Sequence, residues 1–332
     1  MLRRAIATIA VAFISLAAFA QKERHFNLHY SFTVRNVEPG QPLRVWIPLA
    51  HSDRFQDVRV VSQQGDVSLR KTRESEYGNW MLYGETPKAA KSEYRFAVDY
   101  DVLRREKIVL AHDKLVPGAA DRRASRVMLA RFSEPDKLVP ITGLPAELAA
   151  QQAGGATTTL TKAHALYDYV FHTLRYDKTG AGWGHGDTLW ACDSKRGNCT
   201  DFHSLFISMA RSQHIPARFE IGFQFPPDKH SSDTVAYHCW AEFFDQQMGW
   251  IPVDISEAWK HQQLHDYYFG AQDPNRVQFT MGRDLRLNPP QAGPPLNYFV
   301  YPYVEVGNQE HSNVALALSF KDMEQRTVTA KK

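Results

Sequence analysis

The stretch at residues 197–206 constrains the fold of this chain more than any other part of its sequence. It places a glycine turn at Gly197 and then Cys199 at the start of a helix. Unpaired backbone N–H groups and the positive end of the helix dipole favour a thiolate there. The pattern predicts a nucleophile, although a small buried residue is the simpler interpretation of a lone cysteine. The helix is predicted from apolar residues spaced three or four apart, at Phe202, Leu205, Phe206, Met209 and Ala210.

The first twenty residues have the pattern of a secretory signal peptide. Arg3 and Arg4 precede an apolar run at residues 5–19, and residues 18–20 form a small-x-small cleavage site. The run is shorter than the ~20 residues that a membrane helix needs, and no later stretch approaches that length. We therefore expect a periplasmic or secreted protein that starts at Gln21 and has no membrane span. An uncleaved anchor is the alternative.

Export changes how the charges and the cysteines are interpreted. The formal net charge is +3, and it falls to +1 once the two arginines of the signal segment are removed. This charge gives no electrostatic footprint for nucleic acid. The chain has 3 cysteines, and an odd number leaves one thiol unpaired in an oxidising compartment. A disulfide between Cys192 and Cys239 would leave Cys199 free, but the sequence alone does not fix this pairing.

Residues 21–145 are predicted to form a β domain followed by a proline-punctuated linker. Apolar residues alternate strictly from Phe26 to Val34, which is the period of a half-buried strand. A Pro39-Gly40 turn then precedes a strand at residues 43–47. Several short strands at this spacing predict a small antiparallel sheet or sandwich, with a packing or substrate-presenting role. Further extended runs lie at residues 58–61, 67–71, 79–83 and 94–102.

A thiol, an imidazole and a carboxylate follow one another in the second half of the chain. After Cys199, His238 lies in the middle of a strand predicted at residues 235–244, and Asp254 ends a strand predicted at residues 250–254. Cysteine catalysis uses these groups, because a histidine holds the thiolate and protonates the leaving group while a carboxylate orients the histidine. Each residue alone has a simpler interpretation as a core histidine or a turn former.

Four motifs occur in order and with normal spacing, and as a set they resemble the bacterial transglutaminase-like superfamily, which has a papain-like core. The match covers about residues 155–256. It implies an α+β fold in which the cysteine helix packs on an antiparallel sheet, preceded by a β-sandwich-like domain. The motifs are Gly197-Asn198-Cys199-Thr200-Asp201, Ile215-Pro216-Ala217-Arg218, His238-Cys239-Trp240-Ala241-Glu242 and Gly249-Trp250-Ile251-Pro252-Val253-Asp254.

The resemblance also implies roles for single residues. Cys199 would be the nucleophile, His238 the general base and acid, and Asp254 the orienting carboxylate. Acyl groups would pass through a thioester on Cys199, from an amide or peptide bond to water or an amine. The backbone N–H of Cys199 would supply part of the oxyanion hole, and Trp183 or Tyr176 is a candidate for the second donor. No cofactor is implied.

The resemblance further suggests a substrate and an organisation of domains. For an exported bacterial protein the candidate substrates are peptides, proteins or cell-wall peptides, and bacterial relatives favour protease or amidase activity over crosslinking. We expect a signal peptide at residues 1–20, the β domain and linker at 21–145, and the catalytic domain at 146–332. Strands at residues 298–306 and 314–320 are expected to extend the core sheet.

His203 shares a helix face with Cys199 and could hydrogen-bond near the site, but simple packing is expected.

Two alternatives to this interpretation are open. Zinc bound by Cys192, Cys199, His203 and His238 is chemically possible. Because the usual ligand spacings are absent and neighbouring strand residues point to opposite faces, no metal is expected. A non-catalytic binding or assembly module with the same fold is the alternative to an enzyme.

Overall fold

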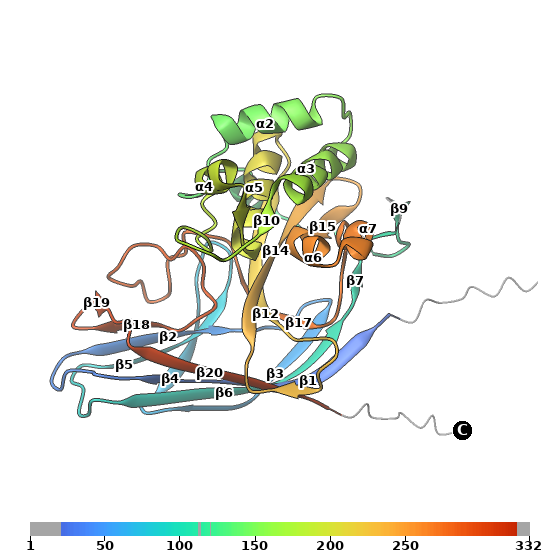
Figure 1. The fold of residues 1–332 in the computed structure, drawn as a ribbon. Coiled ribbons are helices and arrows are strands. Elements are labelled where there is room, and N and C mark those ends of the chain that lie inside the picture. The colour runs from blue at the N-terminus through green and yellow to red at the C-terminus, as the bar shows by residue number, and fades with distance from the viewer. Residues whose placement is uncertain (1–20, 112–113, 120, 324–332) are drawn as a thin grey trace, which may run out of the picture.

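The computed structural model describes residues 21–111, 114–119 and 121–323 of the chain. The expected signal peptide at residues 1–20 lies outside the described residues. The protein has an α+β fold in which a helical layer and a core sheet stand on a β-sandwich (Figure 1). Among the described residues, no helix is long and apolar enough to cross a membrane.

The sandwich consists of two five-stranded sheets with the orders β13-β20-β1-β6-β3 and β19-β18-β2-β5-β4. Apolar residues of β1 (Glu23–Val34) and β6 (Tyr94–Arg105) alternate with exposed ones and are buried between the sheets. The N-terminal region is therefore rich in β-strands, as predicted. The other strands are β2 (Leu43–Leu49), β3 (Gln56–Gly65), β4 (Leu69–Arg73), β5 (Trp80–Thr86), β13 (Ser231–Ser232), β18 (Tyr303–Val306), β19 (Gln309–Glu310) and β20 (Val314–Asp322).

The last strands of the described chain belong to the sandwich. β20 pairs antiparallel with β1 along its whole length, from Val34↔Val314 to Phe26↔Asp322, and β18 pairs with β2. The prediction that these strands extend the core sheet is therefore wrong. Alternation predicted that they are strands, but a period of two is the same whichever sheet receives the strand.

The core sheet has the antiparallel order β15-β14-β12-β17 and carries the central helix α5 on one face. α5 (Cys199–Ser212) begins at the predicted cysteine, and its apolar stripe is buried. The sheet consists of β12 (Ala217–Gln224), β14 (Ala236–Asp245), β15 (Gly249–Val253) and β17 (Arg276–Met281). The sequence did not indicate β17, which pairs with β12.

Short helices surround α5 and cover it from solvent (Figure 1). α3 (Thr159–Thr173) is capped by Thr158, whose side chain accepts the N–H of Thr161. The other helices are α1 (Arg126–Arg131), α2 (Leu144–Ala153), α4 (Thr188–Ser194), α6 (Ile255–Lys260), the 3-10 helix η1 (Gln262–Leu264) and α7 (His265–Tyr268). Short strand pairs connect these layers, namely β7 (Lys107–Ile108) with β16 (Ala271–Gln272), β8 (Leu110–Ala111) with β9 (Lys114–Leu115), and β10 (Arg175–Tyr176) with β11 (Arg196–Gly197).

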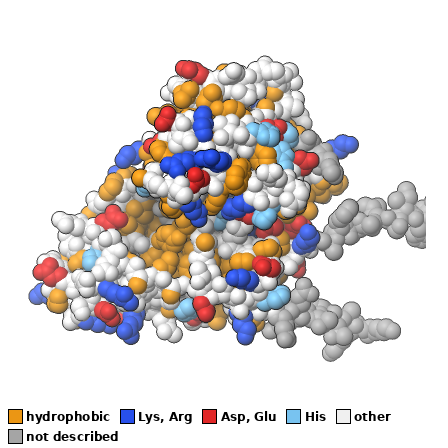
Figure 2. Space-filling model, in the orientation of Figure 1, with side chains coloured by type: hydrophobic (Ala, Val, Ile, Leu, Met, Phe, Trp, Pro, Cys, Tyr) orange, Lys and Arg blue, Asp and Glu red, His pale blue; other side chains and the backbone are white. Residues whose placement is uncertain are grey.

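The surface mixes charges of both signs. On the face seen in Figure 2, basic and acidic side chains are interspersed, and hydrophobic side chains gather in the middle, where the helical layer meets the sandwich. The junction between the two layers is thus the most apolar part of this face.

Candidate active site

A capping box fixes the position of Cys199 at the start of α5. The Asn198 side chain accepts the N–H of Thr200 at 2.9 Å, and the Asp201 carboxylate accepts the N–H of Asn198 at 2.9 Å. Gly197 has φ 151°, and a Cβ atom there would lie 2.3 Å from Asp201 Oδ2. The glycine, asparagine and aspartate around the cysteine therefore hold its backbone in one geometry.

Asp201 also fastens the loop at residues 180–187 beside the cysteine. Its carboxylate accepts the backbone N–H groups of Gly184 at 2.7 Å and Gly186 at 2.9 Å. From the other side, the buried Arg283 donates to the carbonyl of Gly186 at 2.9 Å. These hydrogen bonds tie the loop to α5 and to the segment after β17.

The sulfur of Cys199 lies beside an edge of β14. β15 pairs with β14 only as far as Ala241, opposite Val253, and the next part of the β14 edge faces the cysteine. There the Cys239 thiol donates a hydrogen bond that is the main reason why the pKa of the Cys199 thiol lies well below its usual range. Burial alone would raise the pKa of Cys199. His238 lowers it through a hydrogen bond and through its charge, and the backbone N–H of Cys239 lowers it further. The arrangement favours a thiolate.

His238 lies between the thiol and a carboxylate. Its Nε2 atom is 2.7 Å from Asp254 Oδ2, and its side chain also hydrogen-bonds with Cys199. Burial disfavours a charged imidazole, but the charge and hydrogen bond of Asp254, together with Cys199, raise the pKa of His238 to about 9. These shifts favour a thiolate paired with an imidazolium at neutral pH.

Asp254 is itself held by three further groups. Its Oδ1 accepts the N–H of Glu257 at 3.1 Å and so caps α6, while its Oδ2 accepts Nη1 of the fully buried Arg276 at 2.7 Å. The Ser256 hydroxyl also donates to Oδ1, at 3.3 Å. Burial opposes ionisation, but the charges of His238 and Arg276 hold the pKa of Asp254 well below its usual range. No motif in the sequence indicated Arg276, because it comes from β17, 22 residues further along the chain.

His203 does more than pack, in contrast to our expectation. It is fully buried, and its Nε2 accepts the N–H of Ile255 at 3.0 Å, directly after Asp254. The neutral ring therefore carries its proton on Nδ1, which faces Cys239 Sγ at 3.8 Å. Burial lowers the pKa of His203 to about 4, so the ring is uncharged at neutral pH. It connects the backbone beside Asp254 to the cysteine pair.

The proposed disulfide between Cys192 and Cys239 is not formed. All three cysteines are free and buried. Cys239 Sγ lies 3.9 Å from Thr200 Oγ1 and interacts with Cys199, whereas Cys192 is on α4. Counting cysteines could not reveal this arrangement, because the neighbour of Cys239 is determined by how β14 meets α5.

The two candidates for the second oxyanion donor differ in their surroundings. Tyr176 pairs with Gly197 across the short β10–β11 ladder, close to Cys199, and its ring lies 4.2 Å from Lys260 Nζ. Burial and the nearby Cys199 raise the pKa of its hydroxyl. The indole N–H of Trp183 instead donates to Gly180 within its own loop, at 3.1 Å. Tyr176 is thus the better placed of the two.

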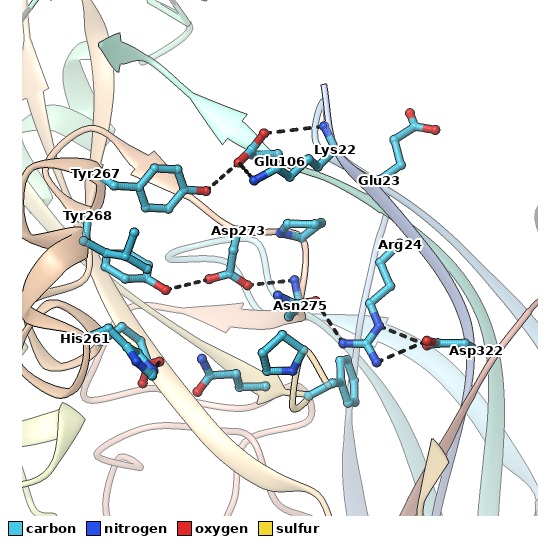
Figure 3. A pocket seen from close by; sticks show the side chains of 16 residues that line it. Lys22, Glu23, Arg24, Glu106, His261, Tyr267, Tyr268, Asp273, Asn275 and Asp322 are labelled. Carbon is cyan, nitrogen blue, oxygen red and sulfur yellow. Dashed lines mark hydrogen bonds and ion pairs between the residues drawn. The ribbon is translucent and has the colours of Figure 1, made fainter. Parts of the chain in front are cut away.

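A cavity of about 620 Å³ is not lined by Cys199 or His238. Tyr267, Tyr268 and Asp273 form one wall, and Arg24 with Asp322 forms the opposite wall (Figure 3). Its charged groups are largely paired with one another, as in the 2.9 Å contact between Arg24 and Asp322. We therefore assign the candidate chemistry to the buried thiol and not to this larger space.

Metal chemistry has no support from the ligand geometry. Within the part of the chain that the structure describes, no group of three or more histidine, cysteine, aspartate or glutamate side chains is arranged to hold a metal ion. The zinc site considered from the sequence is therefore not assembled by these residues.

Comparison with known proteins gives a family for the core. Residues 146–255 match the family model of the transglutaminase-like superfamily. A protein of unassigned function from Haemophilus influenzae is 26% identical over 316 residues, which cover 85% of each chain. A solved structure from Cytophaga hutchinsonii, provisionally described as a cysteine protease, has a TM-score of 0.57 and 15% identity, and covers 90% of this chain and 98% of that chain. The periplasmic domain of TgpA from Pseudomonas aeruginosa has a TM-score of 0.37 and 14% identity, over 73% of this chain and 90% of that chain.

Proposed function

We propose that this chain, which carries a transglutaminase-like core at residues 146–255, is an exported cysteine enzyme that transfers acyl groups through Cys199. The observation that carries the proposal is the row of side chains Cys199, His238 and Asp254, in which a 2.7 Å hydrogen bond joins His238 Nε2 to the carboxylate. The low pKa of the Cys199 thiol and the high pKa of His238 support a preformed ion pair. Such a pair is the ground state of a cysteine nucleophile.

The first half of the proposed reaction forms a thioester. The Cys199 thiolate attacks the carbonyl carbon of an amide or peptide bond, and the carbonyl oxygen takes up the negative charge. The backbone N–H of Cys199, at the first position of α5, is suited to stabilise that oxygen. His238 then gives its proton to the nitrogen as the C–N bond breaks, and the amine leaves. Asp254 keeps the ring oriented throughout.

The second half restores the enzyme. Water or an amine attacks the thioester, and the neutral His238 takes a proton from the attacking atom. The C–S bond then breaks, which releases the acid or the new amide and returns the thiolate and imidazolium. We favour water as the acceptor, and therefore a protease or amidase acting on peptides, proteins or cell-wall peptides. The provisional description of the Cytophaga hutchinsonii structure is in line with this choice.

We also propose that the protein acts outside the cytoplasm. The support is the signal-peptide pattern of residues 1–20, with cleavage before Gln21. Cell fractionation of a tagged chain, together with the N-terminal sequence of the purified protein, tests this part. A mature N-terminus at Gln21 in the extracytoplasmic fraction is expected, and an intact N-terminus in the cytosol would contradict it.

The experiment that tests the activity combines turnover with trapping of the intermediate. The mature protein is incubated with peptide and cell-wall peptide pools, with and without a fluorescent primary amine, and intact-mass spectra are recorded. We expect cleaved peptides, an acyl adduct on Cys199 and little amine incorporation. Cys199→Ala should abolish all of these, and the matched variant Cys192→Ala should retain them. Amine incorporation as the main product would instead identify a transamidase.

A binding module is the second candidate, and one observation favours it. The Cys199 residue is only 2% exposed, so a substrate does not reach the sulfur without movement of its surroundings. If the thiol of the reduced, folded protein does not react with iodoacetamide at neutral pH, the proposed enzyme is refuted and a binding role gains support.

A further inference from the structure

A second, charged cavity lies between the core sheet and the sandwich. Its volume is about 100 Å³. Arg218 and Glu220 of β12 and Glu242 of β14 line it, and they alternate with the residues that face α5, so the cavity lies on the opposite face of the core sheet. Arg104 of β6 lines it from the sandwich. The proposed catalytic side chains do not line this cavity.

Arg104 is a buried cation without an acidic partner at contact distance. It is 2% exposed, and within the described chain no carboxylate oxygen lies within ion-pair distance of it. Its two terminal nitrogens donate to the neutral amide oxygens of Gln56 and Gln272, each at 3.2 Å, and its Nε has no hydrogen-bond partner among the described residues. Acidic side chains, Asp53 first, act on Arg104 only from beyond ion-pair distance. Burial of a cation without an ion-pair partner is unfavourable, so an anion beside Arg104 would stabilise the fold.

Two glutamine amides add unsatisfied donors to the same cavity. Gln272 is fully buried and Gln278 is 5% exposed. Among the described residues, neither Nε2 atom has a hydrogen-bond partner. Buried N–H groups are almost always paired, so unpaired donors are unusual. Arg104, Gln272 and Gln278 line the same cavity, and a hydrogen-bond acceptor bound there would be suited to pair with these donors.

The acids that line the cavity are already engaged. Glu242 pairs with Lys107 and with Arg218, while Glu220 pairs with Arg218 and accepts the indole N–H of Trp240. Over the whole lining, five Lys and Arg side chains face four Asp and Glu side chains. One added negative charge would therefore neutralise the lining. The volume of about 100 Å³ limits a bound anion to a few heavy atoms. A carboxylate has this charge, this size and two acceptor oxygens.

The cavity opens to solvent through a basic mouth. Asp53, Arg54, Asp121 and Arg123 line both the inner cavity and a wider, open depression of about 900 Å³. Arg122 belongs to the depression and is exposed. Three arginines and two aspartates line this entrance, and Arg123 is paired with Asp121, so the remaining net charge of +1 favours the approach of an anion.

We propose that this cavity binds one carboxylate group, held by the Arg104 guanidinium and the amides of Gln272 and Gln278. The carboxylate belongs either to a free small acid or to the C-terminus of a peptide that lies in the mouth. The site is separate from Cys199, so the proposal stands or fails independently of the proposed acyl transfer.

Thermal unfolding of the full mature protein tests the site, with acetate as the probe and chloride at equal ionic strength as the reference. In the wild type we expect Tm to rise and then level off as acetate increases, because the anion binds the folded state. Arg104→Gln removes the buried charge, and it should abolish this rise without lowering Tm in chloride. Gln272→Glu supplies a carboxylate beside Arg104, and it should raise Tm in chloride and abolish the acetate response.

Arg59→Gln is the matched control, because Arg59 is an arginine of β3 whose side chain is 72% exposed. It should keep the full acetate response. An equal rise in all four proteins would indicate a general effect of acetate and would overturn the site, as would no rise in the wild type. If Arg104→Gln does not fold, the Tm of Gln272→Glu in chloride and in acetate tests the site by itself. A tetrapeptide and its C-terminal amide then distinguish the sources, since only the free acid should compete with acetate if a peptide terminus is the ligand.

Discussion

Replacing Asp254 with asparagine tests whether the carboxylate creates the reactive thiol. Asp254 Oδ2 is 2.7 Å from His238 Nε2 and 2.7 Å from Arg276 Nη1, while Oδ1 caps α6. Asparagine is as good a helix cap as aspartate. The substitution therefore removes the negative charge next to the imidazole and keeps the local fold.

The expected effect follows from the pKa of His238, which the site raises to about 9. Relative to an ordinary ~6.5, this pKa corresponds to about 3 kcal/mol in favour of the imidazolium. Without the carboxylate, burial returns the ring to its neutral form at pH 7, and Cys199 loses its cationic partner. A thiol with an ordinary pKa of ~8.5 is about 3% ionised at pH 7. Because the Cys239 hydrogen bond to the sulfur remains, we expect alkylation of Cys199 at pH 7 to slow by at most about 30-fold.

The assay is iodoacetamide labelling between pH 5 and 10, with peptide mapping to separate the three cysteines. In the wild type, the rate at Cys199 should be nearly constant from pH 6 to 8. In Asp254→Asn the rate at Cys199 should instead rise with pH over this range, because the thiol loses its cationic partner but keeps the Cys239 hydrogen bond. Asp273→Asn is the control, because Asp273 contacts Arg276 at 2.5 Å but is not a partner of His238. A decrease of less than threefold in folded Asp254→Asn would refute the reasoning.

Three further predictions concern the groups around the thiol. Cys239→Ala removes the hydrogen bond to the sulfur and should raise the pKa of Cys199, seen as a shift of the same labelling profile to higher pH. The pKa of His203 is about 4 in the folded protein and ~6.5 when unfolded, so stability should fall by up to about 3 kcal/mol as the pH drops from 6.5 to 4. Measured by urea unfolding, the His203→Asn variant should not show this loss of stability between pH 6.5 and 4. An unchanged loss would contradict the assignment of His203 as the titrating group. Gly197→Ala should cost at least about 2 kcal/mol in the same assay, because its Cβ would meet Asp201 at a positive φ; a loss below 0.5 kcal/mol would contradict this.

Local patterns predicted the parts of the site that are close together in the sequence. The 3.6-residue period predicted the helix that begins at Cys199, and alternation predicted the strands that carry His238 and precede Asp254. The capping box is also a local pattern, since Asn198 and Asp201 are within one helical turn. The transglutaminase-like fold followed from these motifs together.

The remaining features depend on contacts between distant segments. Arg276 reaches Asp254 because β17 pairs with β12, and no periodicity indicates that partner. The roles of Cys239 and His203 depend on how closely α5 approaches β14. Arg104 gave no signal in the sequence because an arginine in a strand is ordinary. It indicates a binding site only because it is buried and has no ion-pair partner among the described residues.

The pairing of β20 with β1 has a consequence for biogenesis. A chain made from its N-terminus presents β1 long before β20 exists, so one side of β1 is an unprotected edge while the core sheet forms. Unpaired edges recruit strands from other molecules, and non-local pairing is slow. Truncation just before Val314 would make that exposure permanent, and we expect such a chain to aggregate even though every proposed catalytic residue is intact. The last strand of the described chain is then the one that matters most for preventing aggregation during synthesis.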